Sequence, residues 1–127
     1  MKDFKTAFFL LRLPIAISLL GHGLVRIPKL SVFSDWMVTT MGKSMIPQLI
    51  IIPFSYALPF IEIALGIILL IGWQFRNSIY ASLILMSILI FGSCTIENWA
   101  AIEAQLLHAF YFFALFIFYE KFRTEEP

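Results

Sequence analysis

Apolar residues dominate four stretches of the sequence. About 20 apolar residues span the hydrocarbon core of a bilayer as a helix, and each stretch approaches or exceeds that length. Hydropathy and periodicity place the predicted spans at residues 7–25, 47–72, 78–96 and 100–119. The second is longer than a span requires and contains prolines, so we expect it to be tilted or broken.

The polar segment between the first two spans has its own pattern. Apolar side chains recur there at helical spacing, at Val32, Phe33, Trp36, Met37 and Met41. This predicts a short helix lying at the outer membrane interface, with its indole among the headgroups; a loop with scattered apolar residues is the alternative. The predicted fold is all-α, an integral membrane four-helix bundle with a short interfacial helix between spans 1 and 2. Residues 1–127 form a single domain.

Composition supports a membrane protein. Of the 127 residues, 61% are hydrophobic and 13% are charged, whereas soluble domains average about 25% charged residues; the mean hydropathy is +0.91. A net charge of +1 without a basic tract argues against nucleic acid as a partner. The single Cys94 excludes an intramolecular disulfide and a CxxC redox pair. No Cys/His cluster suggests a metal, so none is expected.

Lysine and arginine indicate the orientation. Arg12 and Pro14 interrupt the first apolar run, so we expect a retained span and not a signal peptide. One side of the predicted bundle carries more cations than the other, with Lys2, Lys5, Arg76, Lys121 and Arg123 against Arg26, Lys29 and Lys43. The richer side is expected to be cytoplasmic, and both termini with it.

Glu62 lies near the middle of the second span. An ionised carboxylate there costs roughly 2.5–3.5 kcal/mol, so it needs a partner, a proton or water. Counting about 1.5 Å per residue places His108 at the same depth and Arg12 within reach of the carboxylate. We therefore expect Glu62 to point into the bundle and to contact Arg12 or His108.

Other polar side chains share faces with this group. In the first span Ser18, His22 and Arg26 are spaced by four residues, and in the fourth a polar face steps by three. Since lipid would leave such groups unpaired, a bundle interior is expected. The candidate ligand-binding residues are Glu62, His108, His22, Arg12, Arg26, Gln105 and Tyr111.

Structural interpretations of these residues remain open. Arg12 and Glu62 can form an ion pair that only sets helix register, or Arg12 can extend to the cytoplasmic surface. His108 with Gln105 can be a satisfied hydrogen-bond pair. His22 and Arg26 can be ordinary interfacial residues, and the cysteine is expected to be a packing residue.

Two stretches carry a family resemblance. Leu11–Leu30, LRLPIAISLLGHGLVRIPKL, resembles the first helix of the DoxX family, with an Arg near the start and Gly-His-Gly followed by a basic residue. Leu58–Arg76, LPFIEIALGIILLIGWQFR, is similar to the second helix. The matching residues are Arg12, His22, Gly23, Arg26, Glu62, Gly66 and Gly72.

The resemblance implies a multi-pass protein of the bacterial inner (cytoplasmic) membrane. Some DoxX relatives are subunits of a thiosulfate:quinone oxidoreductase, while related families include maturation proteins and membrane chaperones, so the fold alone does not decide function. Thiosulfate or dithiol oxidation by these 127 residues alone is not expected, because they contain no paired cysteine and no soluble thiosulfate domain.

Two functions follow as hypotheses. The first is a redox-linked accessory subunit that binds quinone or a lipid-like molecule in a polar intramembrane pocket. Its electrons would come from a membrane or soluble partner protein, since the sequence shows no redox centre, and whether it is an enzyme is left open. The second is a non-enzymatic membrane assembly factor or chaperone. A small transporter is disfavoured because no inverted repeat is visible.

Overall fold

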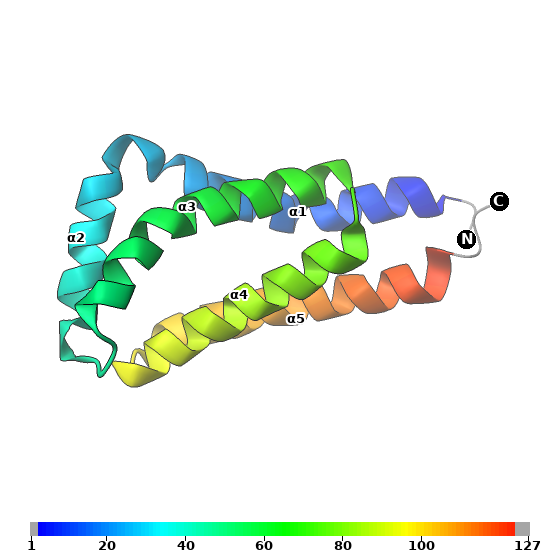
Figure 1. The fold of residues 1–127 in the computed structure, drawn as a ribbon. Coiled ribbons are helices and arrows are strands. Elements are labelled where there is room, and N and C mark those ends of the chain that lie inside the picture. Colours follow the sequence, from blue (N-terminus) through cyan, green and yellow to red (C-terminus); the bar gives the residue numbers. More distant parts are fainter. Residues whose placement is uncertain (1–2, 124–127) are drawn as a thin grey trace.

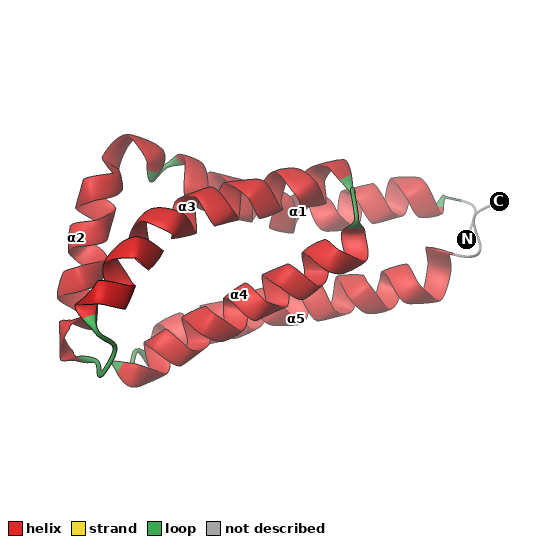
Figure 2. Cartoon of the chain, viewed as in Figure 1, coloured by secondary structure: helices red, strands yellow, loops and turns green. Residues whose placement is uncertain are grey.

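The computed structural model describes residues 3–123, and the regular structure in that range is entirely helical (Figures 1 and 2). The four long helices are α1 (Phe4–Leu24), α3 (Gln48–Ile71), α4 (Phe75–Thr95) and α5 (Trp99–Phe122). Four helical segments of the described range, one beginning with each of these helices, are long and apolar enough to cross a membrane. The four predicted spans are confirmed at this level, with boundaries that differ by at most three residues.

The proline-containing helix α3 is not broken. It continues through Pro53 and Pro59, although each proline lacks the N–H that would bond to the carbonyl four residues earlier. Gly72 ends it in the left-handed conformation, with φ of 83°, which glycine adopts without steric cost.

A shorter helix, α2 (Leu30–Thr40), occupies the segment between α1 and α3, flanked by the 3₁₀ turns η1 (Ile27–Lys29) and η2 (Met41–Lys43). Figure 1 shows α2 running across the ends of the long helices instead of along them. Its buried residues are Phe33 and Ser34. The Ser34 and Ser55 hydroxyls lie 2.7 Å apart in a buried hydrogen bond, which ties α2 to α3.

Helices α1 and α3 pack very closely because glycines lie at their contact. A Cβ at Gly66 would lie 2.7 Å from the Leu20 backbone nitrogen and 3.0 Å from the Ala16 carbonyl oxygen. A Cβ at Gly23 would collide with the Pro59 carbonyl oxygen. Small residues at a helix contact let the backbones approach, which is how membrane helices gain packing energy without a hydrophobic driving force.

Helices α4 and α5 form the second pair, joined by a turn in which Glu97 has a positive φ of 55°. The Asn98 side chain accepts a hydrogen bond from the Ala101 amide and so caps α5. In the described range α5 buries only Phe112 and Leu115, so most of its surface faces outward.

The two pairs are held together where α1 begins and α5 ends. Phe8 packs against Phe75 and Tyr119 with ring centroids 4.6 and 5.2 Å apart, and Phe4 stacks on Phe118 at 5.7 Å. Toward α2, α1 and the α4–α5 pair diverge (Figure 1). The bundle is therefore a wedge, with its packed aromatic end opposite α2.

Candidate functional site

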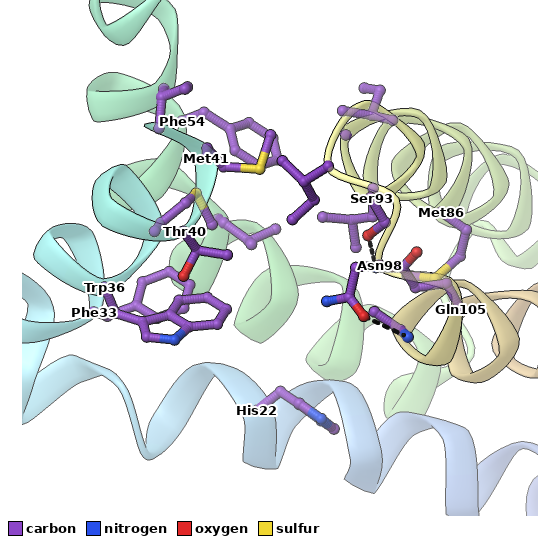
Figure 3. A pocket seen from close by; sticks show the side chains of 18 of the residues that line it. His22, Phe33, Trp36, Thr40, Met41, Phe54, Met86, Ser93, Asn98 and Gln105 are labelled. Carbon is purple, nitrogen blue, oxygen red and sulfur yellow. Dashed lines mark hydrogen bonds between the residues drawn. The ribbon is translucent and has the colours of Figure 1, made fainter. Parts of the chain in front are cut away.

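A cavity of about 390 Å³ lies in the open part of the wedge. All five α-helices contribute side chains to its lining, and most of those side chains are apolar (Figure 3). Helix α2 covers it with Phe33, Trp36 and Met37, while α3 and α4 add Phe54 and Met86. The polar or charged side chains among the residues that line it are His22, Arg26, Thr40, Glu62, Ser93, Asn98, Gln105 and His108.

Glu62 is buried, as predicted from its position, with 5% of its surface exposed. Its partner is Arg26, whose Nη1 donates to Oε1 at 2.8 Å. The arginine side chain is 25% exposed and the glutamate side chain 7%. The guanidinium also lies over the Phe33 ring, 4.4 Å from the centroid, a cation–π geometry. One cation thus links α1, α2 and α3 at the cavity.

The expected contact between Glu62 and Arg12 is absent. Arg12 is buried, and its Nε and Nη2 donate to the carbonyl oxygens of Leu69 and Leu70, at 2.7 and 3.4 Å. Its guanidinium fills the space beside Gly72, where a Cβ would lie 2.7 Å from Nη2. The helices α1 and α3 run antiparallel, and Arg12, in the first half of α1, lies level with the C-terminal end of α3 and not with its centre. Arg12 therefore satisfies the free carbonyls of a helix C-terminus.

Two histidines face each other beside the ion pair. The rings of His22 and His108 are 6.2 Å apart and nearly perpendicular, at 84°. His108 Nε2 lies 3.2 Å from the Ser18 hydroxyl and His108 Nδ1 lies 2.9 Å from the Ala104 carbonyl oxygen. His22 Nδ1 lies 2.6 Å from the Ser18 carbonyl oxygen. Neither ring is hydrogen-bonded to Glu62 in the described structure, so the alternative predicted partner, His108, does not hold the carboxylate either.

The predicted pair of His108 and Gln105 does not form, although both line the cavity. Gln105 instead donates to the Ser93 hydroxyl at 3.1 Å, and its Oε1 is buried without a partner among the described residues. Tyr111 does not line the cavity; its hydroxyl donates to the Leu11 carbonyl oxygen at 2.6 Å. Five of the seven candidates therefore meet at the cavity, while Arg12 and Tyr111 lie elsewhere.

The candidate ligand-binding residues included none from α2, η2 or the α4–α5 turn, although these segments also line the cavity. Trp36, Thr40 and Met41 line one side of the cavity, and Ser93 and Asn98 line the other (Figure 3). The helical spacing of the apolar residues in α2 was the available signal, because a helix that crosses the end of a bundle presents that face inward.

Within residues 3–123, no three His, Cys, Asp or Glu side chains group as metal ligands would. Cys94 is exposed, so the predicted packing role is not observed.

Comparisons with protein-family models, with curated proteins and with solved structures found no match to this chain.

Proposed function

We propose that this chain is an accessory subunit of a membrane redox system, and that it binds a quinone or another lipid-like molecule in the cavity. The observation that carries the proposal is the combination of apolar walls with a compact group of polar side chains. Ligand sites of roughly 300–1,000 Å³ with mostly apolar linings and a few convergent polar groups are typical of small-molecule binding. The cavity of about 390 Å³ falls in that range.

The polar side chains that line the cavity suit the head group of such a ligand. The Arg26–Glu62 pair and the two histidines line the cavity, where they would bind a head group, while the aromatic and aliphatic walls would hold a ring or chain. Glu62 and the histidines would exchange the protons that accompany quinone chemistry. Electrons would come from a partner protein, in the membrane or in solution.

The membrane placement is part of the proposal. We assign the protein to the DoxX-like proteins of the bacterial inner membrane, with both termini cytoplasmic and α2 at the outer interface. In support, α1 begins and α5 ends at one end of the bundle (Figure 1), where Lys5, Arg76, Lys121 and Arg123 gather. The opposite end has Arg26, Lys29 and Lys43. The positive-inside rule puts the richer end in the cytoplasm.

A second candidate function is a non-enzymatic assembly factor or chaperone for another membrane protein. The observation in its favour is the outward surface of α5, where Leu107 and Phe110 are 71% and 66% exposed. An apolar helix face of this kind packs against lipid or against a partner's transmembrane helix. Material that co-purifies with the chain separates the two functions.

Two glycine variants make the test specific. Gly92 lines the cavity, and a Cβ there would lie 3.7 Å from the Met41 methyl group, so Gly92→Leu should occupy the cavity. Gly21 does not line it and has nothing within 4 Å, so Gly21→Leu is the matched control. The proteins would be purified in mild detergent, and bound molecules identified by mass spectrometry.

We expect a quinone or lipid-like molecule with the unmodified protein and with Gly21→Leu, and loss of that molecule with Gly92→Leu. Equal retention by all three proteins would contradict binding in the cavity. A membrane protein that co-purifies with all three, without a small molecule, would favour the assembly function.

A further inference from the structure

The hydrogen-bond partners of the two histidine rings decide which ring nitrogen carries the proton. A carbonyl oxygen only accepts hydrogen bonds, so the Nδ1 atoms beside the Ser18 and Ala104 carbonyls, at 2.6 and 2.9 Å, must carry protons. In the neutral rings both Nε2 atoms are then acceptors. His108 Nε2 is satisfied by the Ser18 hydroxyl at 3.2 Å. His22 Nε2 has no hydrogen-bond partner among residues 3–123, which leaves one free acceptor at the cavity.

Two more free acceptors lie in the same lining. Arg26 binds only Oε1 of Glu62, and the other carboxylate oxygen has no protein partner in the described range. Gln105 donates a hydrogen bond from its amide nitrogen to the Ser93 hydroxyl, while its Oε1 is buried and unsatisfied. Of these three acceptors, Gln105 Oε1 is the buried one, and a buried acceptor without a donor costs about 1–3 kcal/mol. Together with the more open acceptors of His22 and Glu62, it favours an occupant that donates a hydrogen bond.

The charge balance narrows that occupant to a neutral molecule. Arg26 already neutralises Glu62, so an ammonium head group would bring an uncompensated charge into an apolar site, which is costly. An anionic head group would bring a second negative charge to a site where Arg26 already pairs with Glu62. A neutral hydroxyl avoids both penalties and supplies the missing hydrogen atom.

We infer that the cavity selects an amphiphile whose neutral head group donates hydrogen bonds through hydroxyls, as a phenol or a hydroquinone does, over one that only accepts them. The inference rests on the proposed binding function and adds the chemical class of the head group. For a quinone pair it means that the reduced form binds more tightly than the oxidised form, whose two carbonyls offer no donor.

A matched pair of probes tests the inference on the full chain. The probes are a long-chain alkylphenol and its methyl ether, which share ring and tail and differ in one hydrogen-bond donor. The chain has three tryptophans; Trp73→Phe and Trp99→Phe leave Trp36, which lines the cavity, as a local fluorophore. Each probe would be titrated into the protein in phosphatidylcholine nanodiscs, with the Gly92→Leu variant as the correction for partitioning into lipid.

We expect the phenol to bind about tenfold more tightly than the ether, the effect of one net hydrogen bond at a desolvated site. His22→Phe removes a free acceptor, so the ratio of the phenol affinity to the ether affinity should fall severalfold. Gln105→Met removes a second acceptor and should lower the preference for the phenol in the same way. It replaces the histidine variant if that variant does not fold.

The outcomes separate the inference from the function on which it rests. Equal affinity for the two probes, abolished by Gly92→Leu, would overturn the donor preference and leave the binding function standing; so would tighter binding of the ether. Absence of any response to the phenol, the ether and a quinone of the same tail would overturn both.

Discussion

The ion pair between Arg26 and Glu62 provides the sharpest test of the structure. Arg26→Met removes the cation and leaves a carboxylate whose side chain is only 7% exposed. Breaking a buried pair costs about 3–5 kcal/mol in soluble proteins, mainly because the remaining charge is unpaired. The arginine side chain is 25% exposed, and solvent screening lowers the cost, so we expect about 2–3 kcal/mol.

The measurement is thermal unfolding in detergent. For a chain of this size, 1 kcal/mol corresponds to a shift of roughly 4 °C, so Arg26→Met should lower the melting temperature by about 8–12 °C. Glu62→Gln in the same chain removes the orphaned charge. The double variant Arg26→Met/Glu62→Gln should therefore recover more than half of the loss.

An exposed ion pair is the matched control. Arg76 pairs with Glu120 at the opposite end of the bundle, and its side chain is 44% exposed. Surface pairs contribute about 0–1 kcal/mol, so Arg76→Met should change the melting temperature by at most a few degrees. Equal effects of Arg26→Met and Arg76→Met, or additive losses when Glu62→Gln is combined with Arg26→Met, would refute the assignment of Arg26 as the partner of the buried carboxylate.

Two further predictions concern packing and topology. Gly66→Ala should destabilise the protein by about 1–3 kcal/mol, because the new Cβ meets backbone atoms of α1. Gly21 has open space around it, so Gly21→Ala should stabilise the protein by roughly 0.5 kcal/mol through helix propensity. Equal melting temperatures for the two variants would contradict the close helix contact. In the proposed orientation, a membrane-impermeant thiol reagent added to intact cells should label Lys43→Cys and not Arg76→Cys, both made in a Cys94→Ala background, and the reverse pattern would invert the topology.

Hydropathy alone determined the number and position of the four helices that are long and apolar enough to cross a membrane. Each of the long helices begins and ends within three residues of the predicted span, because a run of apolar residues long enough to cross a bilayer has few other stable structures. Helical spacing in residues 30–41 likewise matches the presence of α2. These properties are local, since they depend on composition and period within one segment.

The sequence also predicted which polar residues face inward, because charge in an apolar span is expensive wherever it is exposed to lipid. Glu62 is buried, and His22, Arg26, Gln105 and His108 all line the cavity. Position along a helix was enough to select these candidates.

Only the tertiary structure decided how they pair. Depth counting put Arg12 within reach of Glu62, but the close packing of α1 on α3 at Gly66 sets its side chain against the last carbonyls of α3 instead. Arg26, assigned to the outer edge, reaches the carboxylate because its flexible side chain extends from just beyond the end of α1.

The cavity itself depends on the angle between helix pairs. Aromatic packing joins the pairs at one end, and α2 crosses the open end (Figure 1). Hydropathy and periodicity describe one helix at a time, and neither contains the crossing angles or the side-chain reach that bring distant segments together. Partner choice and cavity shape are therefore properties of the assembled bundle.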